Sequence, residues 1–495
     1  MATHRASPDP STVDTRLSTG VAGLDTILCG GFLPGRTYMV RGEPGVGKTA
    51  LGLHFLADGA ARDERVLFLT QGATQEAVRQ DAASIGVPMD GVDFLDFTPD
   101  PNEFEVADTY DVFEPGDAER TRYVSTVVAA VRETRPTRVF LDALTQGRHL
   151  AEDVVEFRRQ AHALLRFFVG EGATVVFASG SSDRRADEDL QFMSDGVLHL
   201  EYSPQGGRIV SVTKLRGSPF RLGRHSLRIT DHGLEVYPRL VPEAHARPYR
   251  DEQIGTGIER LDVLLGGGIE RGSISLVTGP SGVGKTTLAT QFAKEAALRG
   301  ERSVIYTFEE ATATFVHRSE AIGMPISKMV AAGSLSIVEA EPLEYTADQF
   351  AIAVREEVEQ REAKLVVLDS LSGYRLAIRG ENLVEHVHAL CRYLRNMGAT
   401  VIVLYEVTSV TGDFRATEVG LSYLADNIVF LRYVEIDSEL RRVIGVLKKR
   451  STDFEKKLRE LTITAHGIEV GEPLTGLRGI LRGVADRVDG SSRGD

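Results

Sequence analysis

Several residue types and patterns are scarce in this chain of 495 residues: it has no tryptophan and only two cysteines. Cys29 and Cys391 lie far apart and have no ligand-like spacing, so the sequence supports neither a disulfide framework nor a zinc site. No stretch approaches the ~18 uninterrupted apolar residues of a membrane span, and the polar start lacks the apolar core of an export signal. We therefore expect a cytoplasmic protein whose residues 1–16 form a flexible tail.

Basic residues are also under-represented, with 57 Lys and Arg against 71 Asp and Glu and a net charge of -14. Phosphate backbones are usually neutralised by a basic surface, so this balance makes nucleic acid an unlikely partner, although it leaves room for a local basic channel. The remaining composition, 42% hydrophobic and 26% charged, is typical of a soluble globular protein. The length predicts roughly two to four domains.

The chain does contain an internal repeat. TGVAGLDTILCGGF at Thr19–Phe32 aligns with TGIERLDVLLGGGI at Thr256–Ile269, and the same offset aligns GEPGVGKT with GPSGVGKT. Short apolar runs such as RVLFLT and KLVVLD alternate with longer amphipathic stretches in both copies, which predicts parallel sheets covered by helices on both faces. The sequence therefore predicts an α/β fold with two tandem doubly wound domains.

The domain limits follow from the same alignment. We expect an N-terminal domain at 17–240, a linker at 241–253 that contains several prolines and charges, a C-terminal domain at 254–483 and a short tail at 484–495. A later change of offset places about ten extra residues in the first copy, most plausibly as a surface loop within its acidic stretch DPNEFEVADTYDVFEPGDAERTR.

Each copy carries a phosphate-binding glycine loop between an apolar run and a helical pattern, which is the context that this motif requires. Its backbone N–H groups can surround phosphates, its lysine can reach the terminal phosphates of ATP, and its threonine can hold Mg²⁺. The first loop supplies Gly42, Gly45, Val46, Gly47, Lys48 and Thr49, and the second supplies Gly279, Ser281, Gly282, Val283, Gly284, Lys285, Thr286 and Thr287. Two matches at equivalent positions make a chance glycine turn an unconvincing alternative.

One aspartate in each copy ends an apolar strand, Asp142 after TRVFL and Asp369 after KLVVL. Doubly wound sheets place their ligand chemistry at the carboxyl ends of strands, so both aspartates are candidate Mg²⁺ ligands beside the threonine of the loop. An aspartate at this place can also simply cap the next turn, and the two roles can coexist.

The two copies differ where a phosphoryl transferase needs a carboxylate for the attacking oxygen. VIYTFEEAT supplies Glu309 and Glu310 in the second copy, whereas the first copy reads VLFLTQGAT, with Gly72 and Ala73 at those positions. Glu76 could substitute in the first copy, and the second copy's glutamates could be solvated charges. We predict that the C-terminal domain is catalytic and that the N-terminal domain binds ATP but hydrolyses it slowly.

With these motifs, the chain resembles the KaiC family of circadian-clock ATPases and autokinases, within the RecA-like superfamily, from about Thr19 through Gly483. The entry segment before each loop, the TFEE, LDSLS and YVEI segments and the tandem layout support this resemblance. It implies two RecA-like domains and a homohexamer of two stacked rings that binds ATP and Mg²⁺ between subunits. It also implies that a lysine and an arginine complete the neighbouring subunit's site, here Lys214 with Arg216 and Lys448 with Arg450. The residues alone would indicate edge-strand charges that aid solubility.

Clock-type members of this family phosphorylate themselves in the C-terminal domain. The resemblance maps their serine onto Ser422, with Tyr423 in place of the adjacent threonine, and a third threonine onto Thr417; the residues alone would indicate an unmodified serine. The chain ends 12 residues after Gly483, so the tail through which clock members receive an activating partner looks truncated. The expected protein partner is therefore a signalling or clock protein of unknown identity.

The sequence thus predicts a KaiC-like ring ATPase with serine/threonine autokinase activity in its C-terminal domain. Two alternatives stay open. The first is a scaffold in which ATP holds the ring together and little turnover occurs. The second is a RecA-like DNA motor, which the acidic composition and the lack of a basic, aromatic DNA-binding loop disfavour.

Overall fold

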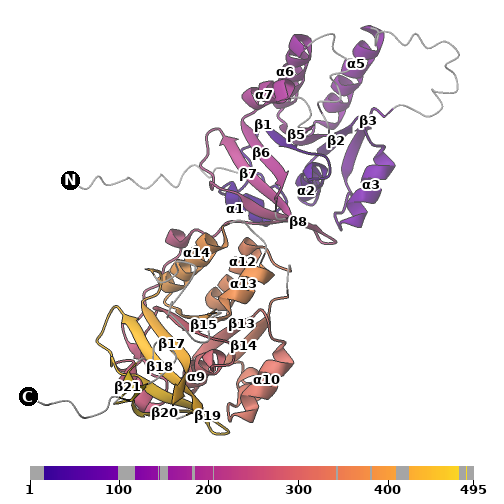
Figure 1. The fold of residues 1–495 in the computed structure, drawn as a ribbon. Coiled ribbons are helices and arrows are strands. Elements are labelled where there is room, and N and C mark those ends of the chain that lie inside the picture. Colours follow the sequence, from indigo (N-terminus) through magenta and orange to yellow (C-terminus); the bar gives the residue numbers. More distant parts are fainter. Residues whose placement is uncertain are drawn as a thin grey trace, which may run out of the picture. The chain divides into compact units, whose positions relative to one another are not determined.

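A computed structural model describes residues 16–98, 117–142, 144, 154–180, 184–204, 206–341, 344–378, 382–407, 423–436, 438–475, 477–478 and 486–487. The chain divides into two compact units, Met1–Arg239 and Leu240–Asp495. Each unit is built around its own large sheet (Figure 1). Each also has its own apolar core.

The first unit alternates strands and helices up to β6 and then closes with a run of strands. Its elements are α1 (Ala22–Ile27), β1 (Thr37–Gly42), α2 (Lys48–Ala60), β2 (Val66–Thr70), α3 (Gln75–Ser84), β3 (Val92–Asp96), α5 (Asp117–Thr134), β4 (Arg138–Asp142), α6 (Val154–Gly170), β5 (Thr174–Gly180), α7 (Arg184–Met193), β6 (Gly196–Tyr202), β7 (Arg208–Leu215), β8 (His225–Thr230) and β9 (Gly233–Tyr237).

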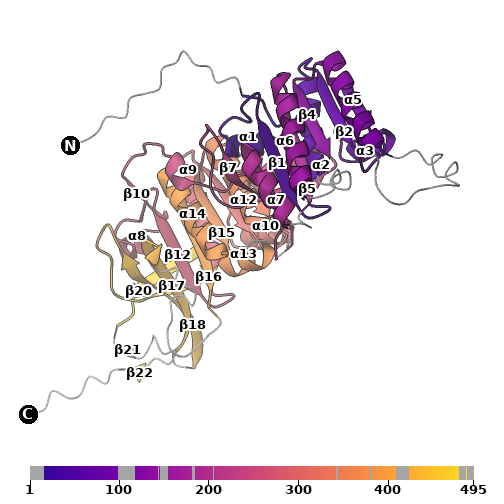
Figure 2. The same ribbon diagram turned by 90° about the horizontal axis from the view of Figure 1, so that it is seen from above.

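These strands form one sheet in the order β3-β2-β4-β5-β1-β6-β7-β8-β9. The first six in this order are parallel, and β7, β8 and β9 continue the sheet antiparallel. Helices α1, α2 and α3 pack on one face, and α5, α6 and α7 pack on the other (Figures 1 and 2). Strands covered on both faces have nearly continuous apolar sequences, which is why VLFLT and RVFLD could be recognised.

The second unit repeats this plan. Its elements are η2 (Pro242–Ala244), β10 (Gln253–Ile254), α8 (Glu259–Leu264), β11 (Ile269–Glu270), β12 (Ile274–Gly279), α9 (Lys285–Leu298), β13 (Arg302–Thr307), α10 (Thr312–Ala321), α11 (Ile326–Ala331), β14 (Leu335–Glu339), α12 (Ala347–Glu359), β15 (Ala363–Asp369), α13 (Leu371–Ala377), α14 (Leu383–Asn396), β16 (Thr400–Glu406), β17 (Asn427–Ile436), β18 (Glu439–Lys449), β19 (Arg459–Thr464), β20 (Gly467–Pro473), β21 (Leu477–Arg478) and β22 (Asp486–Arg487).

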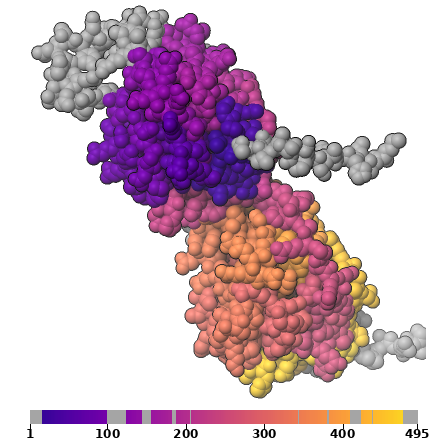
Figure 3. Space-filling view, turned by 180° about the vertical axis from the view of Figure 1, so that it is seen from behind, coloured from indigo at the N-terminus to yellow at the C-terminus, as the bar shows by residue number. Residues whose placement is uncertain are grey.

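Its main sheet has the order β14-β13-β15-β16-β12-β17-β18-β19-β20, which matches the first sheet strand for strand. Helices α8 to α11 cover one face and α12 to α14 cover the other. The antiparallel strands at its end form part of the surface, coloured yellow in the space-filling view (Figure 3). The predicted α/β fold of two tandem RecA-like domains is therefore confirmed.

Part of the segment that separates the two repeats packs on the second unit and forms what we call the α14 strap, residues 240–247. Leu240 is buried in the second unit's core. The His245 ring meets the edge of Tyr393 on α14, with ring centroids 5.3 Å apart, and Asn396 donates a hydrogen bond to the carbonyl of Pro242 at 2.9 Å. These contacts attach the strap to one side of α14.

No helix in the part of the chain that the structure describes is both long and apolar enough to span a membrane.

Candidate active sites

Each glycine loop joins the end of a central strand to the start of a helix. Gly47 and Gly284 are the N-terminal cap residues of α2 and α9, and both have a left-handed backbone, with φ of 113° and 110°. A residue with a side chain would be strained there, so glycine is required at this turn. The loop can then direct its backbone N–H groups and the first turn of the helix toward a phosphate.

The other predicted loop residues take matching places in the two units. Val46 and Val283 are buried and attach each loop to the core, whereas Gly45, Ser281 and Gly282 are exposed on the loop surface. Thr287 is buried within α9. The exposed residues of each loop are therefore accessible to a ligand.

The two loop lysines fold back across their own loops. Lys48 Nζ donates to the carbonyls of Gly42 and Glu43, each at 2.8 Å. Lys285 Nζ donates to the carbonyls of Gly279 and Pro280 at 2.9 and 2.8 Å. Burial lowers the pKa of both lysines, and the nearby carboxylates oppose this shift. Each ammonium group therefore lies where it can bind a phosphate bound in the loop.

The structure brings each candidate metal-binding threonine together with its aspartate. Thr49 Oγ1 donates to Asp142 Oδ2 at 3.1 Å, and Thr286 Oγ1 donates to Asp369 Oδ2 at 2.7 Å. Burial raises the pKa of both aspartates, against the lowering effect of the threonine hydrogen bonds and the loop lysines. Hydroxyl and carboxylate oxygens beside a phosphate site are suitable ligands for Mg²⁺, so both pairs fit this ion.

The predicted difference between the repeats falls on one structurally matched turn. In the first unit, Thr70 Oγ1 donates to the carbonyl of Ala73 at 2.8 Å. In the second unit, Thr307 Oγ1 donates to the carbonyl of Glu310 at the same distance. The turns superimpose residue for residue in their hydrogen bonds, so Gly72 and Ala73 occupy the positions of Glu309 and Glu310, and the first unit lacks both carboxylates there.

The two glutamates of the second unit have different partners. Glu309 Oε1 accepts a hydrogen bond from Ser370 Oγ at 3.1 Å. Glu310 Oε2 forms an ion pair with Arg318 Nη2 at 2.8 Å. Sequence reasoning missed Ser370 and Arg318, although the repeat alignment held a signal: the corresponding residues of the first copy are Ala143 and Asp81. Among the described residues, Glu309 is thus the one of the two carboxylates without an ion pair.

Glu76, the substitute considered for the first unit, is exposed in the first turn of α3. We expect Glu76→Gln to change ATP hydrolysis by less than about twofold, because an exposed side chain outside the strand-end turn contributes no positioned base. Phosphate release should be measured in a Lys285→Ala background, which isolates the N-terminal site. A loss of tenfold or more would identify Glu76 as the base of that domain.

The Lys-x-Arg pairs lie toward the amino ends of the central strands, whereas each glycine loop follows the carboxyl end of β1 or β12. Lys214 on β7 pairs with Val197 of β6, and Val197 pairs with Met39 of β1. The β1 strand continues from Met39 to Gly42, where the glycine loop begins. Its ammonium donates to the carbonyls of Gln191 and Phe192, at the end of the helix that precedes β6. Lys214 is therefore level with the middle of β1, and Arg216 is level with its first residue, Thr37, whereas the glycine loop follows its last residue, Gly42.

The second unit repeats this placement. Lys448 pairs with Ile428 and so lies level with Leu276 of β12, and its ammonium donates to the carbonyl of Ala425 at 2.8 Å. Arg450 is exposed and donates to the carbonyl of Tyr423 at 2.7 Å. Burial and the adjacent arginines lower the pKa of Lys214 and of Lys448. The predicted phosphoacceptors, Ser422 and Thr417, lie outside the described residues.

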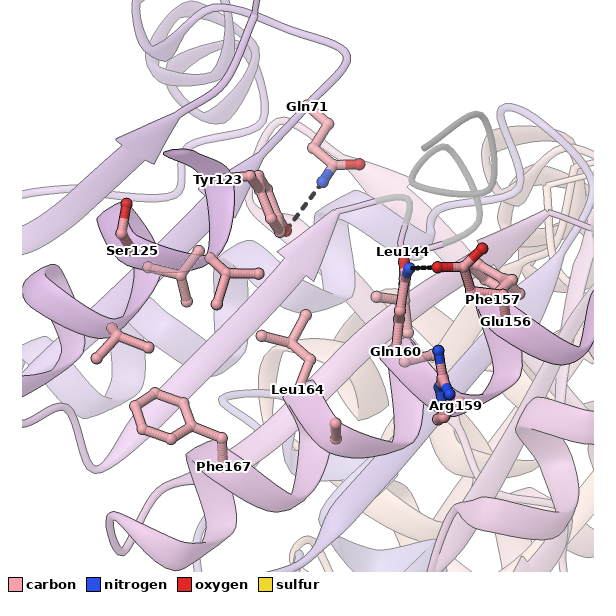
Figure 4. Close-up of a pocket in the computed structure, with 15 residues that line it drawn as sticks. Gln71, Tyr123, Ser125, Leu144, Glu156, Phe157, Arg159, Gln160, Leu164 and Phe167 are labelled. Carbon is pink, nitrogen blue, oxygen red and sulfur yellow. Dashed lines mark hydrogen bonds between the residues drawn. The ribbon is translucent and has the colours of Figure 1, made fainter. Parts of the chain in front are cut away.

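An apolar cavity of about 740 Å³ lies between α5 and α6 of the first unit, beside its strand-end turn (Figure 4). Gln71, the residue before Gly72, donates to the Tyr123 hydroxyl at 3.0 Å on the cavity wall. In the second unit, α13 occupies the space between α12 and the strand-end turn, where the Tyr374 ring packs on Phe308 and Phe350. The residues that correspond to most of α13 in the first unit are not among those described.

Comparison with known proteins gives consistent matches over both units. A family model described as "ATPase: KaiC" matches residues 17–241 and residues 254–475. The "Circadian clock oscillator protein KaiC" of Parasynechococcus marenigrum (strain WH8102) is 28% identical over 494 residues, which cover 97% of this chain and 95% of the relative. The protein of the same name from Prochlorococcus marinus (strain MIT 9313) is 28% identical over 97% of this chain and 97% of its own length. That from Synechococcus elongatus (strain ATCC 33912 / PCC 7942 / FACHB-805) is 28% identical over 96% of this chain and 92% of its own length.

Proposed function

Because the chain belongs to the KaiC family of ATPases, we propose that its C-terminal domain carries out Mg²⁺-dependent ATP hydrolysis while its N-terminal domain mainly binds ATP and supports assembly. The observation that carries this proposal is the strand-end turn. Both domains keep the loop lysine and the threonine–aspartate pair, but only the second has carboxylates at Glu309 and Glu310. Binding needs the first set of residues, and water activation needs the second.

In the C-terminal site, Lys285 would bind the terminal phosphates of ATP, and Thr286 and Asp369 would hold Mg²⁺. When bound there, Mg²⁺ neutralises charge on the phosphate oxygens. Glu309 would orient the attacking water and accept its proton, because its carboxylate is not bound to a cation. Glu310 would instead keep Arg318 against the turn. The N-terminal site has the same binding residues, but its strand-end turn carries Gly72 and Ala73 in place of the two carboxylates.

We propose that the active assembly is a homohexameric ring in which each nucleotide lies between two subunits. The placement of the Lys-x-Arg pairs supports this arrangement, since Lys448 is level with Leu276 and Arg450 lies further toward the amino end of β12, away from the glycine loop of their own domain. An adjacent subunit could present them to the phosphates bound by Lys285. Lys214 and Arg216 would do the same in the N-terminal ring.

The C-terminal domain is also proposed to phosphorylate itself on Ser422, with Thr417 as a second acceptor. Glu309 would then take the proton from the serine hydroxyl instead of from water. Such a charge-adding modification would suit communication with a signalling or clock protein.

This proposal can be tested by incubating the full-length protein with γ-labelled ATP and Mg²⁺. We expect labelled protein and free phosphate from the wild type, and a loss of most of the protein label from Ser422→Ala with free phosphate retained. Residual label that disappears only after Thr417→Ala would identify the second acceptor. Free phosphate without any protein label would contradict the autokinase and leave an ATPase.

A nucleotide-gated scaffold is the second candidate function, and the missing carboxylates at Gly72 and Ala73 favour it for the N-terminal ring. A scaffold needs ATP for assembly and little turnover. If neither labelled protein nor free phosphate forms, while ATP still assembles the ring, the scaffold would replace the ATPase as the function of both rings.

A further inference from the structure

The Ser370 side chain lies between Glu309 and the first turn of α13. Its hydroxyl oxygen accepts a hydrogen bond from the Gly373 N–H at 3.2 Å, as the N-terminal cap of this helix. It also donates to Glu309 Oε1 at 3.1 Å. A serine hydroxyl has one hydrogen and an ionised carboxylate can only accept, so the single donor of Ser370 is directed at Glu309.

Gly373 brings the backbone of the same turn close to Glu309. A Cβ atom at position 373 would lie 2.9 Å from both Cγ and Oε1 of Glu309 and 2.8 Å from Cβ of Phe308. Such distances are too short for real contacts, so only glycine allows the turn to approach the glutamate in this way. Ser370 is itself buried, with an exposed fraction of 4%. Glu309 is therefore held from one side by a rigid, hydrogen-bonded turn.

The two repeats differ at both ends of this contact. The first copy has Gly72 at the position of Glu309 and Ala143 at the position of Ser370, although it keeps the loop lysine, the threonine and the strand-end aspartate. The hydroxyl is thus absent from the copy that lacks the carboxylate. A serine that served only to cap a helix would not be expected to be present or absent together with the glutamate.

We propose that Ser370 is a positioning residue for ATP hydrolysis: its hydroxyl, fixed by the Gly373 N–H, holds the Glu309 carboxylate at the place where the attacking water must be oriented. This inference rests on the proposed role of Glu309 as the base. Rotation of an unheld glutamate side chain would move its oxygens by an ångström or more, and misplacement of this size can cost about a hundredfold in rate.

The test compares Ser370→Ala with Thr346→Ala in the full-length protein. Thr346 caps α12 and accepts from the Gln349 N–H at 3.3 Å, so its loss removes a cap of the same kind without touching the site. We expect Ser370→Ala to lower kcat by about tenfold or more with KM and ATP affinity unchanged. Thr346→Ala should keep kcat within about twofold, and both variants should show a similar small fall in melting temperature, because each loses one helix cap.

Combining Ser370→Ala with Glu309→Gln decides whether the serine acts through the glutamate. If it does, Ser370→Ala should change the residual turnover of Glu309→Gln by less than about twofold. A further loss as large as in the wild-type background would overturn the inference, as would a kcat for Ser370→Ala equal to that of Thr346→Ala. Unchanged turnover in Glu309→Gln alone would overturn the proposed base as well, which separates the two failures.

Discussion

Replacing Glu309 with glutamine is expected to lower ATP hydrolysis by roughly 10²–10⁴-fold, the usual contribution of a positioned general base. Glutamine keeps the size of the side chain and can still hydrogen-bond to Ser370, but its amide cannot accept a proton from water. ATP binding should not change, because Lys285, Thr286 and Asp369 are untouched. Steady-state phosphate release and equilibrium ATP binding should be measured on the same preparation.

Glu310→Gln should have a much smaller effect, less than about tenfold, because this carboxylate is paired with Arg318 at 2.8 Å and a partly exposed pair contributes little. Glu356→Gln, an exposed change on α12, serves as the matched control and should leave turnover unchanged. A loss in Glu310→Gln that equals or exceeds the loss in Glu309→Gln would reverse the assignment of the base. Equal activity of all three variants would show that neither Glu309 nor Glu310 takes part in the reaction.

The second large effect is expected from Arg450→Ala, which should lower hydrolysis by about 10³-fold if the arginine completes a neighbouring subunit's site. Lys285→Ala should be similarly inactive. In rings assembled from an equal mixture of these two variants, about a quarter of the C-terminal sites would combine an intact lysine with an intact arginine. We therefore expect the mixture to recover about a quarter of wild-type activity, measured as phosphate release.

Both variants retain the N-terminal glycine loop, so the mixed rings should still assemble. The control mixes Arg450→Ala with a chain that carries both substitutions. No site in these rings has both residues, and activity should not return. If the first mixture is no more active than its two components, Arg450 does not act across a subunit boundary.

Local sequence patterns were sufficient for the fold and for part of the site. A glycine loop is defined by a few adjacent residues, and an aspartate that ends an apolar run is placed by the strand itself, so the positions of Lys285 and Asp369 at the loop and at the strand end could be predicted from the sequence. The entry segments also have a local basis. Asp262 Oδ1 accepts hydrogen bonds from the Thr256 N–H and hydroxyl at 2.7 and 2.8 Å, which explains the spacing of threonine and aspartate in both copies.

The different partners of Glu309 and Glu310 could not be predicted from sequence spacing alone. Ser370 lies 61 residues from Glu309 along the chain and meets it only when β13 and β15 pair. Arg318 lies eight residues after Glu310, on α10, and their ion pair depends on how this helix leaves the turn. The position of Lys448 relative to its own glycine loop likewise depends on the register of β17 with β12 and with β18. These are properties of the assembled sheet rather than of any single segment.

The α14 strap also determines where the chain could be divided to produce the C-terminal domain separately. A fragment that began at residue 254, where the second repeat resumes in sequence, would lose Leu240 from its core and His245 from the edge of Tyr393. The part of α14 near Tyr393 that the strap covers would then face water, and an exposed apolar patch promotes aggregation. A fragment that began before Leu240 would retain its native covering, so any separate study of this domain should place the cut on the N-terminal side of the strap.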